Sequence, residues 1–298
     1  MAQAAEGVLE DESLPITLAV AVTRPDRYRL LLASLEGQFR EHDHFIVVLE
    51  GVEIAEPAHI PLMDGRSLEI RYVRHPTAQG LSCCRNKIIE LAPTRFVVFL
   101  DDDTEATPDL LQRYRKRFAE NQQVVGGSLC LPEGYPTWPL WLPRTYGSLL
   151  GIHQAEKKIW GGNFGFDRHF AIQHGLCFAR ALGRHGNNLW SGDDTSFVKD
   201  MESRNARILF DPAIVVYHHI STSRFNFRYL LRRAYWQGRS EVLRRSIGPG
   251  LRKEFRRAFG QTSPRPPRSL RRVLAGALLF TSVVLGVIVQ LVADLLPP

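Results

Sequence analysis

The sequence of 298 residues has few cysteines and lacks the common glycine-rich phosphate-binding motifs. Its four cysteines show no C-x-x-C spacing, which argues against a zinc knuckle or a disulfide framework and suits a reducing compartment. No G-x-G-x-x-G follows the first apolar run and no G-x-x-x-x-G-K-[ST] occurs. The sequence therefore lacks the main motif of a Rossmann dehydrogenase and that of a P-loop enzyme. Residues 1–14 lack an apolar core, so we expect a flexible tail there rather than a signal peptide.

The net charge of +7 is unevenly distributed along the chain. Residues 203–272 contain 17 Lys and Arg against 3 Asp and Glu, whereas the remainder contains 21 against 28. Such a basic block predicts an anionic partner, for example phosphates, acidic lipid or nucleic acid. We expect no nucleic acid, because the block leads directly into a hydrophobic segment and contains no recognised nucleic-acid module.

A nearly continuous apolar run covers residues 273–296. As a helix, its 24 residues would extend roughly 36 Å, enough to cross a hydrocarbon core of about 30 Å. Several arginines precede it, and the positive-inside tendency then predicts a protein anchored on the cytoplasmic face of the cell membrane. We therefore expect a basic helical or linker region over 223–270 and a membrane segment over 271–298. A buried helix or an interfacial hairpin is the alternative, because Asp294 is unfavourable in lipid.

Apolar runs and helix-like segments alternate over the first 125 residues. This alternation, with short connections, predicts a mainly parallel sheet covered by helices on both faces. Ligands bind beyond the carboxyl ends of the strands in such sheets, where Thr23, Arg24 and Glu50 stand. The expected strands are 16–22, 45–49, 69–74 and 96–100, and the expected helices are 28–38, 83–91 and 109–121.

Three adjacent carboxylates, Asp101, Asp102 and Asp103, follow the expected strand 96–100. Neighbouring carboxylates repel one another unless a cation or strong donors lie among them, and alternate residues of an extended chain point the same way. Asp101 and Asp103 therefore predict a site for Mg²⁺ or Mn²⁺. The alternative is a solvated turn with a helix N-cap, where Asp is common.

A second acidic pair, Asp193 and Asp194, precedes an expected helix over 195–203. The helix dipole keeps a carboxylate ionised at such a position, although simple capping explains the pair equally well. Further on, we expect a strand over 207–210, a proline turn, and an apolar segment that ends at His218 and His219. Either histidine could complete a metal site or serve as a structural residue.

An acceptor wall is one interpretation of the aromatic residues in 133–147, which include Trp138 and Trp141, because aromatic faces stack on sugars. Packing over the sheet is the other. Gly162 could let the backbone approach a ligand closely and Asn163 could offer amide contacts, or the two could form a simple turn.

The order of these segments resembles the GT-A family-2 glycosyltransferases, bacterial-type and membrane-associated, which transfer a sugar from a nucleotide donor. The resemblance covers roughly residues 16–245. The chain departs from the pattern at Glu50, where such enzymes commonly have Asp, and at Asp193, where the paired motif usually has Glu. The segments that carry the resemblance are Thr23-Arg-Pro25, Glu50, Gly80-Leu-Ser-Cys-Cys-Arg-Asn86, Trp160-Gly-Gly-Asn-Phe-Gly-Phe-Asp-Arg168 and Ser191-Gly-Asp-Asp-Thr195.

The resemblance implies a GT-A catalytic domain over 15–222, with a nucleotide-sugar half (15–125) and an acceptor half (126–222). It further implies a divalent metal and the inverting transfer of one sugar to a glycan or lipid-linked acceptor in surface polysaccharide synthesis. A sugar-phosphate nucleotidyltransferase and a non-catalytic, membrane-tethered basic scaffold remain as alternatives.

The resemblance also implies roles for individual residues. Asp194 would be the general base, and Asp193 would orient Asp194 or the acceptor. Asp103 would bind the metal, with Asp101 and His218 beside it. The nucleotide sugar would contact Thr23, Arg24, Glu50, Arg85, Asp101 and Asp102, and the acceptor would contact Gly162, Asn163, Trp138 and Trp141.

Overall fold

The computed structural model describes residues 14–54, 57–75, 77–135, 142, 146–151, 158–259 and 270–295. Residues 1–13 of the expected tail, Trp138 and Trp141 lie outside these residues, whereas Leu14, the last residue of that tail, is buried in the core. The strands are β1 (Ile16–Val22), β2 (His44–Glu50), β3 (His59–Pro61), β4 (Ser67–His75), β5 (Phe96–Asp101), β6 (Thr104–Ala106), β7 (Val124–Cys130), β8 (Asn163–Asp167) and β9 (Ile208–His218). The α-helices are α1 (Pro25–Ser34), α2 (Leu81–Leu91), α3 (Leu110–Ala119), α4 (Gly147–Leu150), α5 (Arg168–Gln173), α6 (Asp193–Ser203), α7 (Phe227–Leu243), α8 (Ile247–Phe259) and α9 (Leu270–Leu295), and short 3-10 helices lie at η3 (Arg180–Leu182) and η4 (Thr222–Phe225).

The described strands form one sheet in the order β3-β4-β2-β1-β5-β8-β7-β9-β6. The expected parallel pairing holds for β4-β2-β1-β5. However, β8 runs antiparallel to both of its neighbours, so the sheet as a whole is mixed rather than mainly parallel. Because β1, β2 and β5 are parallel and adjacent, Val22 lies opposite Leu49 and Ala21 lies opposite Asp101. The ends of these three strands therefore share one edge of the sheet.

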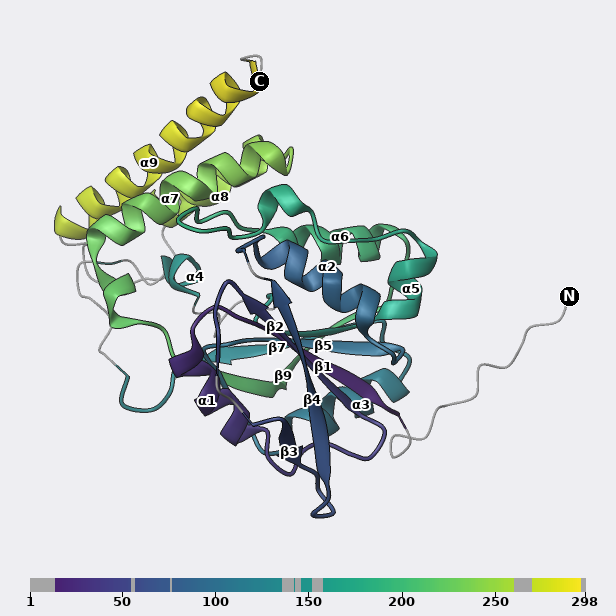
Figure 1. Cartoon of the computed structure of the whole chain (residues 1–298). Helices are drawn as coiled ribbons and strands as arrows, with labels where there is room; N and C mark the ends of the chain where they lie inside the picture. Colours follow the sequence, from purple (N-terminus) through teal and green to yellow (C-terminus); the bar gives the residue numbers. More distant parts are fainter. Residues whose placement is uncertain are drawn as a thin grey trace, which may run out of the picture.

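Helices cover both faces of the sheet, as the sequence predicted (Figure 1). One apolar core joins the sheet to α1 and α3 through side chains such as Tyr28, Leu110 and Phe118. A second core joins the opposite face to α2, α5 and α6, with Ile88 and Phe197 in its interior. Strands β1, β2 and β5 are thus buried on both faces, which explains why they read as continuous apolar runs, whereas β4, nearer the edge of the sheet, is only partly buried.

Three helices begin earlier than the sequence pattern predicted: α1, α6 and also α2, which starts at Leu81 rather than at residue 83. Helix α1 starts at Pro25, because the fixed φ of proline and its missing N–H suit the first helical position. Helix α6 starts at Asp193 and follows Gly192, whose φ of +93° is a left-handed conformation that glycine adopts readily. Both acidic residues of the second pair therefore lie inside the first turn of α6 rather than before it.

The segment ending at His218 is one continuous strand and not two strands separated by a proline turn. β9 keeps parallel pairing with β7 on both sides of a register shift between Gly126 and Ser128. Pro212 lies at this irregularity, where a residue without an N–H costs no ladder hydrogen bond.

Helices α7, α8 and α9 form a separate layer over α4 (Figure 1). Helix α9 packs along α7 so closely that a Cβ on Gly238 would lie 2.0 Å from the Val283 carbonyl oxygen. A Cβ on Gly286 would lie 1.9 Å from the Tyr235 carbonyl oxygen. The basic region before the apolar run contains the regular helix α8, whereas residues 260–269 lie outside the described part of the chain.

Candidate active site

A cleft of about 520 Å³ opens at the edge where β1, β2 and β5 end. It brings together segments that are far apart in the sequence, namely the ends of the parallel strands, α2, the start of α6 and the end of β9. Of the predicted site residues, it is lined by Thr23, Arg24, Glu50, Arg85, Asp101, Asp102, Asp103, Gly162, Asp193, Asp194 and His218.

The three aspartates after β5 have different surroundings. Asp102 is buried and accepts hydrogen bonds from the backbone N–H groups of Thr23 and Arg24, at 2.8 and 2.9 Å. It also accepts one from the Arg24 guanidinium at 2.7 Å. Burial raises the pKa of Asp102, and Arg24 opposes that rise. Asp102 therefore fixes the turn between β1 and α1 and holds Arg24 in the cleft.

Asp101, Asp103 and His218 offer ligand atoms that lie within 4.8 Å of one another. His218 Nδ1 lies 2.9 Å from the Gly151 carbonyl oxygen, which as acceptor requires a proton on that nitrogen, and His218 Nε2 lies 3.2 Å from Asp103. The neighbouring His219 instead pairs with Glu105 at 2.8 Å. His218 is thus the histidine that faces the carboxylates.

The chemistry of this group fits a divalent cation. Asp103 Oδ2 is buried and accepts no hydrogen bond from the residues that the structure describes, although guanidinium nitrogens of Arg24 and Arg224 lie 2.8 and 3.6 Å away. Burial alone would raise the pKa of Asp103, but His218 and the two arginines hold it below its ordinary value. An ionised carboxylate that ion pairs but lacks a well-aligned donor, together with an imidazole nitrogen, is a donor set that suits Mg²⁺ or Mn²⁺.

The second acidic pair lies across the cleft at the start of α6. Asp193 is buried and pairs with the buried Arg85 at 2.7 Å, while Ser82 donates to it at 3.2 Å. Burial raises the pKa of Asp193, an effect that Arg85 partly offsets. Asp194 is half-buried; its Oδ2 accepts from the Gly161 N–H at 2.7 Å and its Oδ1 from the Thr195 N–H at 2.6 Å. Arg85 thereby positions the pair and is not a solvent-facing helix residue.

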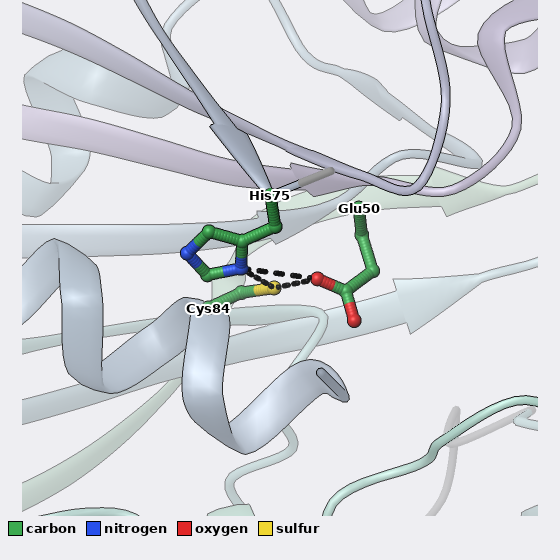
Figure 2. Close-up of side chains that lie close together, drawn as sticks. All are labelled: Glu50, His75 and Cys84. Carbon is green, nitrogen blue, oxygen red and sulfur yellow. Dashed lines mark hydrogen bonds and ion pairs between the residues drawn. The ribbon is translucent and has the colours of Figure 1, made fainter. Parts of the chain in front are cut away.

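Glu50 belongs to a buried cluster with His75 and Cys84, in which the His75 ring and the Cys84 sulfur both face the carboxylate (Figure 2). The Cys84 thiol donates to Glu50 at 3.0 Å, His75 Nδ1 lies 3.2 Å from the same carboxylate, and the Gly80 N–H donates to its other oxygen. Burial alone would raise the pKa of Glu50, but these hydrogen bonds hold it below the ordinary value. The three ligand atoms lie close enough to one another to hold a metal ion. However, the Glu50 carboxylate already accepts hydrogen bonds from Cys84 and Gly80, and these bonds fix the start of α2.

Asn163 does not reach the cleft, contrary to the acceptor contact that the sequence suggested. Its side chain is fully buried, accepts a hydrogen bond from the Tyr114 hydroxyl at 2.7 Å and donates to the carbonyl oxygens of Ser128 and Ile214 at 3.0 and 3.2 Å. Asn163 is the first residue of β8, and its side chain points into the interior between α3, β7 and β9. Gly162 does line the cleft, where a Cβ would lie 2.7 Å from Asp101 Oδ2.

The sequence did not predict three arginines that line the cleft, namely Arg184, Arg224 and Arg233. Arg184 lies in an irregular segment that shows no pattern, and the other two belong to the basic block that composition alone assigned to an anionic surface. Arginine has no preferred spacing in a cleft, so only the fold reveals that these three converge.

A mixed α/β sheet with a carboxylate-rich cleft at the carboxyl ends of its parallel strands defines the GT-A class of glycosyltransferases. Residues 23–174 match the family model described as glycosyl transferase family 2. The chain therefore belongs to glycosyltransferase family 2, as the resemblance implied.

Two relatives are similar in sequence. The glucosyl-dolichyl phosphate glucuronosyltransferase of Haloferax volcanii is 25% identical over 173 residues, which cover 55% of this chain and 55% of the relative. The succinoglycan biosynthesis protein ExoM of Rhizobium meliloti is 26% identical over 244 residues, which cover 78% of this chain and 75% of the relative. The match thus spans about half the length of the archaeal relative.

Two solved structures share the fold. The mannosyltransferase PcManGT from Pyrobaculum calidifontis, in complex with GDP-Man and Mn²⁺, superposes with a TM-score of 0.56 at 15% identity over 94% of this chain and 79% of that chain. Residues 1–349 of S. aureus TarS, in complex with UDP, superpose with a TM-score of 0.52 at 16% identity over 81% and 72%.

Proposed function

We propose that the protein is a metal-dependent, inverting glycosyltransferase that transfers one sugar from a nucleoside-diphosphate sugar to a glycan or lipid-linked acceptor during surface polysaccharide synthesis. The observation that carries the proposal is the shared cleft of two acidic groups: Asp101, Asp103 and His218 on one side, and Asp193 and Asp194 on the other. Relatives named for glycosyl transfer to a dolichyl phosphate-linked sugar and for succinoglycan synthesis support the acceptor class.

The donor half of the cleft would bind the nucleotide sugar at Thr23, Arg24 and Glu50. Asp101, Asp103 and His218 would hold Mn²⁺ or Mg²⁺, which when bound neutralises the charge that develops on the leaving diphosphate. Arg24 pairs with Asp102 and Asp103 beside this site, so its guanidinium would contact the phosphates of the donor.

Asp194 would take the proton of the acceptor hydroxyl. The bond from the acceptor oxygen to the anomeric carbon would form as the bond from that carbon to the diphosphate oxygen breaks, and the proton would remain on Asp194. The N–H and the hydroxyl of Thr195 both donate to Asp194 Oδ1, whereas Oδ2 accepts only from the Gly161 N–H among the described residues, so Oδ2 keeps a lone pair for the acceptor. Attack opposite the leaving group inverts the anomeric configuration.

Helix α9 would hold the enzyme at the cytoplasmic face of the cell membrane. Val273–Leu295 is long and apolar enough to cross a bilayer, and 39% of its most apolar window is buried within the protein. Its other side exposes Leu274, Leu278 and Ile288. Arg252, Lys253 and Arg256 of α8 would add attraction to anionic head groups of about 1 kcal/mol each.

Two variants test the proposal. Asp103→Ala is expected to abolish both transfer and the Mn²⁺-dependent thermal stabilisation by a nucleoside diphosphate, because ligand binding stabilises the folded state. Asp194→Asn is expected to keep that stabilisation but to lose about 10²–10⁴-fold in transfer rate, the usual contribution of a general base. Asp200→Asn, an exposed change on the same helix, is the matched control. Full activity of Asp103→Ala, or loss of nucleotide binding in Asp194→Asn alone, would contradict these assignments.

A further inference from the structure

Three arginines in the cleft have no role in the reaction described above. Arg184 follows η3, Arg224 lies in η4 and Arg233 lies in α7, and all three line the cleft. Burial, then the charge of Arg184, and less strongly the charge of Arg224 lower the pKa of Arg233 to about 10, so the three groups lie near one another. Positive charge is therefore concentrated at one place.

These charges have little compensation. Within the described ranges, no carboxylate lies within salt-bridge distance of Arg184 or Arg233, and the ion pair of Arg224 with Asp103 is long, at 3.6 Å. Arg233 is only 6% exposed, and its Nε is buried without a hydrogen-bond partner in the part of the chain that the structure describes. Its terminal nitrogen donates only to neutral oxygens, those of Leu189, Ser191 and Gln237, at 3.3 to 3.4 Å.

A buried cation without a counter-ion costs free energy, so a site of this kind calls for an anion from outside the chain. The guanidinium group binds phosphate oxygens through two parallel N–H donors, and three guanidinium groups around one space suit a group with several phosphate oxygens. The charge and the donor geometry together indicate a phosphate or diphosphate ligand.

We propose that Arg184, Arg224 and Arg233 bind the phosphate or diphosphate group of the acceptor, which makes the acceptor a phosphate-linked lipid or sugar. This inference rests on the glycosyl transfer proposed above. The donor also carries a diphosphate, but the charge of that group would be met by the cation site at Asp101, Asp103 and His218 together with Arg24. Of the three arginines, Arg224 is the one that borders this cation site, 3.6 Å from Asp103.

The position of Arg233 favours the acceptor as the source of the anion. Arg233 donates to Ser191, which stands three residues before Asp194, the group that would receive the proton of the acceptor. Its helix, α7, also packs against the apolar α9 and against α8. A phosphate held by Arg233 would therefore lie between the reacting hydroxyl and the apolar helices that a lipid chain could follow.

The test measures binding of geranyl diphosphate and of geraniol to the full-length protein. The donor half is first filled with Mn²⁺ and the nucleoside diphosphate that stabilises the enzyme most. We expect geranyl diphosphate to bind and geraniol not to bind. Arg233→Gln is expected to raise the Kd of geranyl diphosphate by about ten- to hundredfold, the value of a charge-assisted hydrogen bond. The nucleotide Kd is expected to stay unchanged.

The matched control is Arg228→Gln, which removes the same charge from an exposed position of the same helix and should change neither Kd. Arg233→Gln should also keep or raise the Tm, because it removes an uncompensated buried charge. If Arg233→Gln lowers the Tm, the binding experiment is made with Arg184→Gln instead, because Arg184 is only half-buried. The same rise in the Kd of geranyl diphosphate is expected.

Three results would overturn the proposal. If the nucleoside diphosphate displaces geranyl diphosphate, or if Arg233→Gln weakens both ligands equally, the arginines serve the donor. If geraniol binds as tightly as geranyl diphosphate, no phosphate subsite exists. Absence of nucleotide binding would instead contradict the proposed function, and the comparison of geranyl diphosphate with geraniol would then be made without nucleotide, where it still decides the phosphate subsite.

Discussion

Replacement of Asn163 decides whether this side chain supports the fold or binds the acceptor. It is fully buried and connects α3, β7 and β9 through three hydrogen bonds, to the Tyr114 hydroxyl and to the carbonyl oxygens of Ser128 and Ile214. In Asn163→Ala all three partners lose their hydrogen bond in a site without solvent. At about 1 kcal/mol per hydrogen bond, the free energy of unfolding should fall by about 3 kcal/mol.

A double-mutant cycle measures the hydrogen bond between Asn163 and Tyr114 independently. Tyr114→Phe removes only the hydroxyl, so it should lower the free energy of unfolding by about 1 kcal/mol. The double variant with Asn163→Ala should lose about 1 kcal/mol less than the sum of the two, because both single changes break the same bond. Urea unfolding of the purified protein, followed by tryptophan fluorescence, measures all three.

A different outcome would contradict the buried position of Asn163. Asn163→Ala could cost less than about 0.5 kcal/mol, which is the effect of an ordinary surface change, and raise the KM for the acceptor instead. The buried network would then be wrong, and the acceptor contact suggested by the sequence would be restored. A change that affects stability alone, with an unchanged KM, supports the buried position.

Two further predictions concern the Glu50 cluster and the helix layer. Because the pKa of Glu50 is lowered in the folded protein, its stabilisation is present above the ordinary value of 4.5 and is lost as the pH falls through the lower folded value. Glu50→Gln should therefore reduce stability near neutral pH and flatten the acid limb of a urea-unfolding series. Gly286→Leu would place a side chain against the Tyr235 carbonyl oxygen and should cost about 1–3 kcal/mol or more in unfolding free energy, whereas Leu285→Ala, at a site 52% exposed, should have little effect.

The sequence was sufficient for the parallel half of the sheet and for its functional edge. Buried parallel strands must be apolar on both faces, so β1, β2 and β5 stand out as continuous runs, and the polar residue after each run marks the edge. The positions of Thr23, Glu50 and Asp101 in one cleft follow from this geometry. The roles of these residues in catalysis remain predictions until the variants are measured.

The sequence did not predict which side chains at the ends of β8 and β9 face the cleft. Gly162 precedes β8 and lines the cleft, whereas Asn163, the first residue of β8, is fully buried. This difference depends on where β8 starts and on its antiparallel pairing with β5. Likewise His218 ends β9 and His219 follows it, and only the pairing of β9 with β6 determines that His218 faces Asp103.

The basic block shows why composition alone does not assign a partner to each charge. As a run of charge it predicts an anionic partner, such as phosphates or acidic lipid, for all its members, but a helix exposes only part of its circumference to any one neighbour. On α7, Arg228 and Arg232 are exposed, whereas Arg233 is buried in the cleft. The same helix therefore presents arginines to two different surroundings, the molecular surface and the cleft. Substitutions of Arg228 and of Arg233 can test these two surroundings separately, which no count of charges can do.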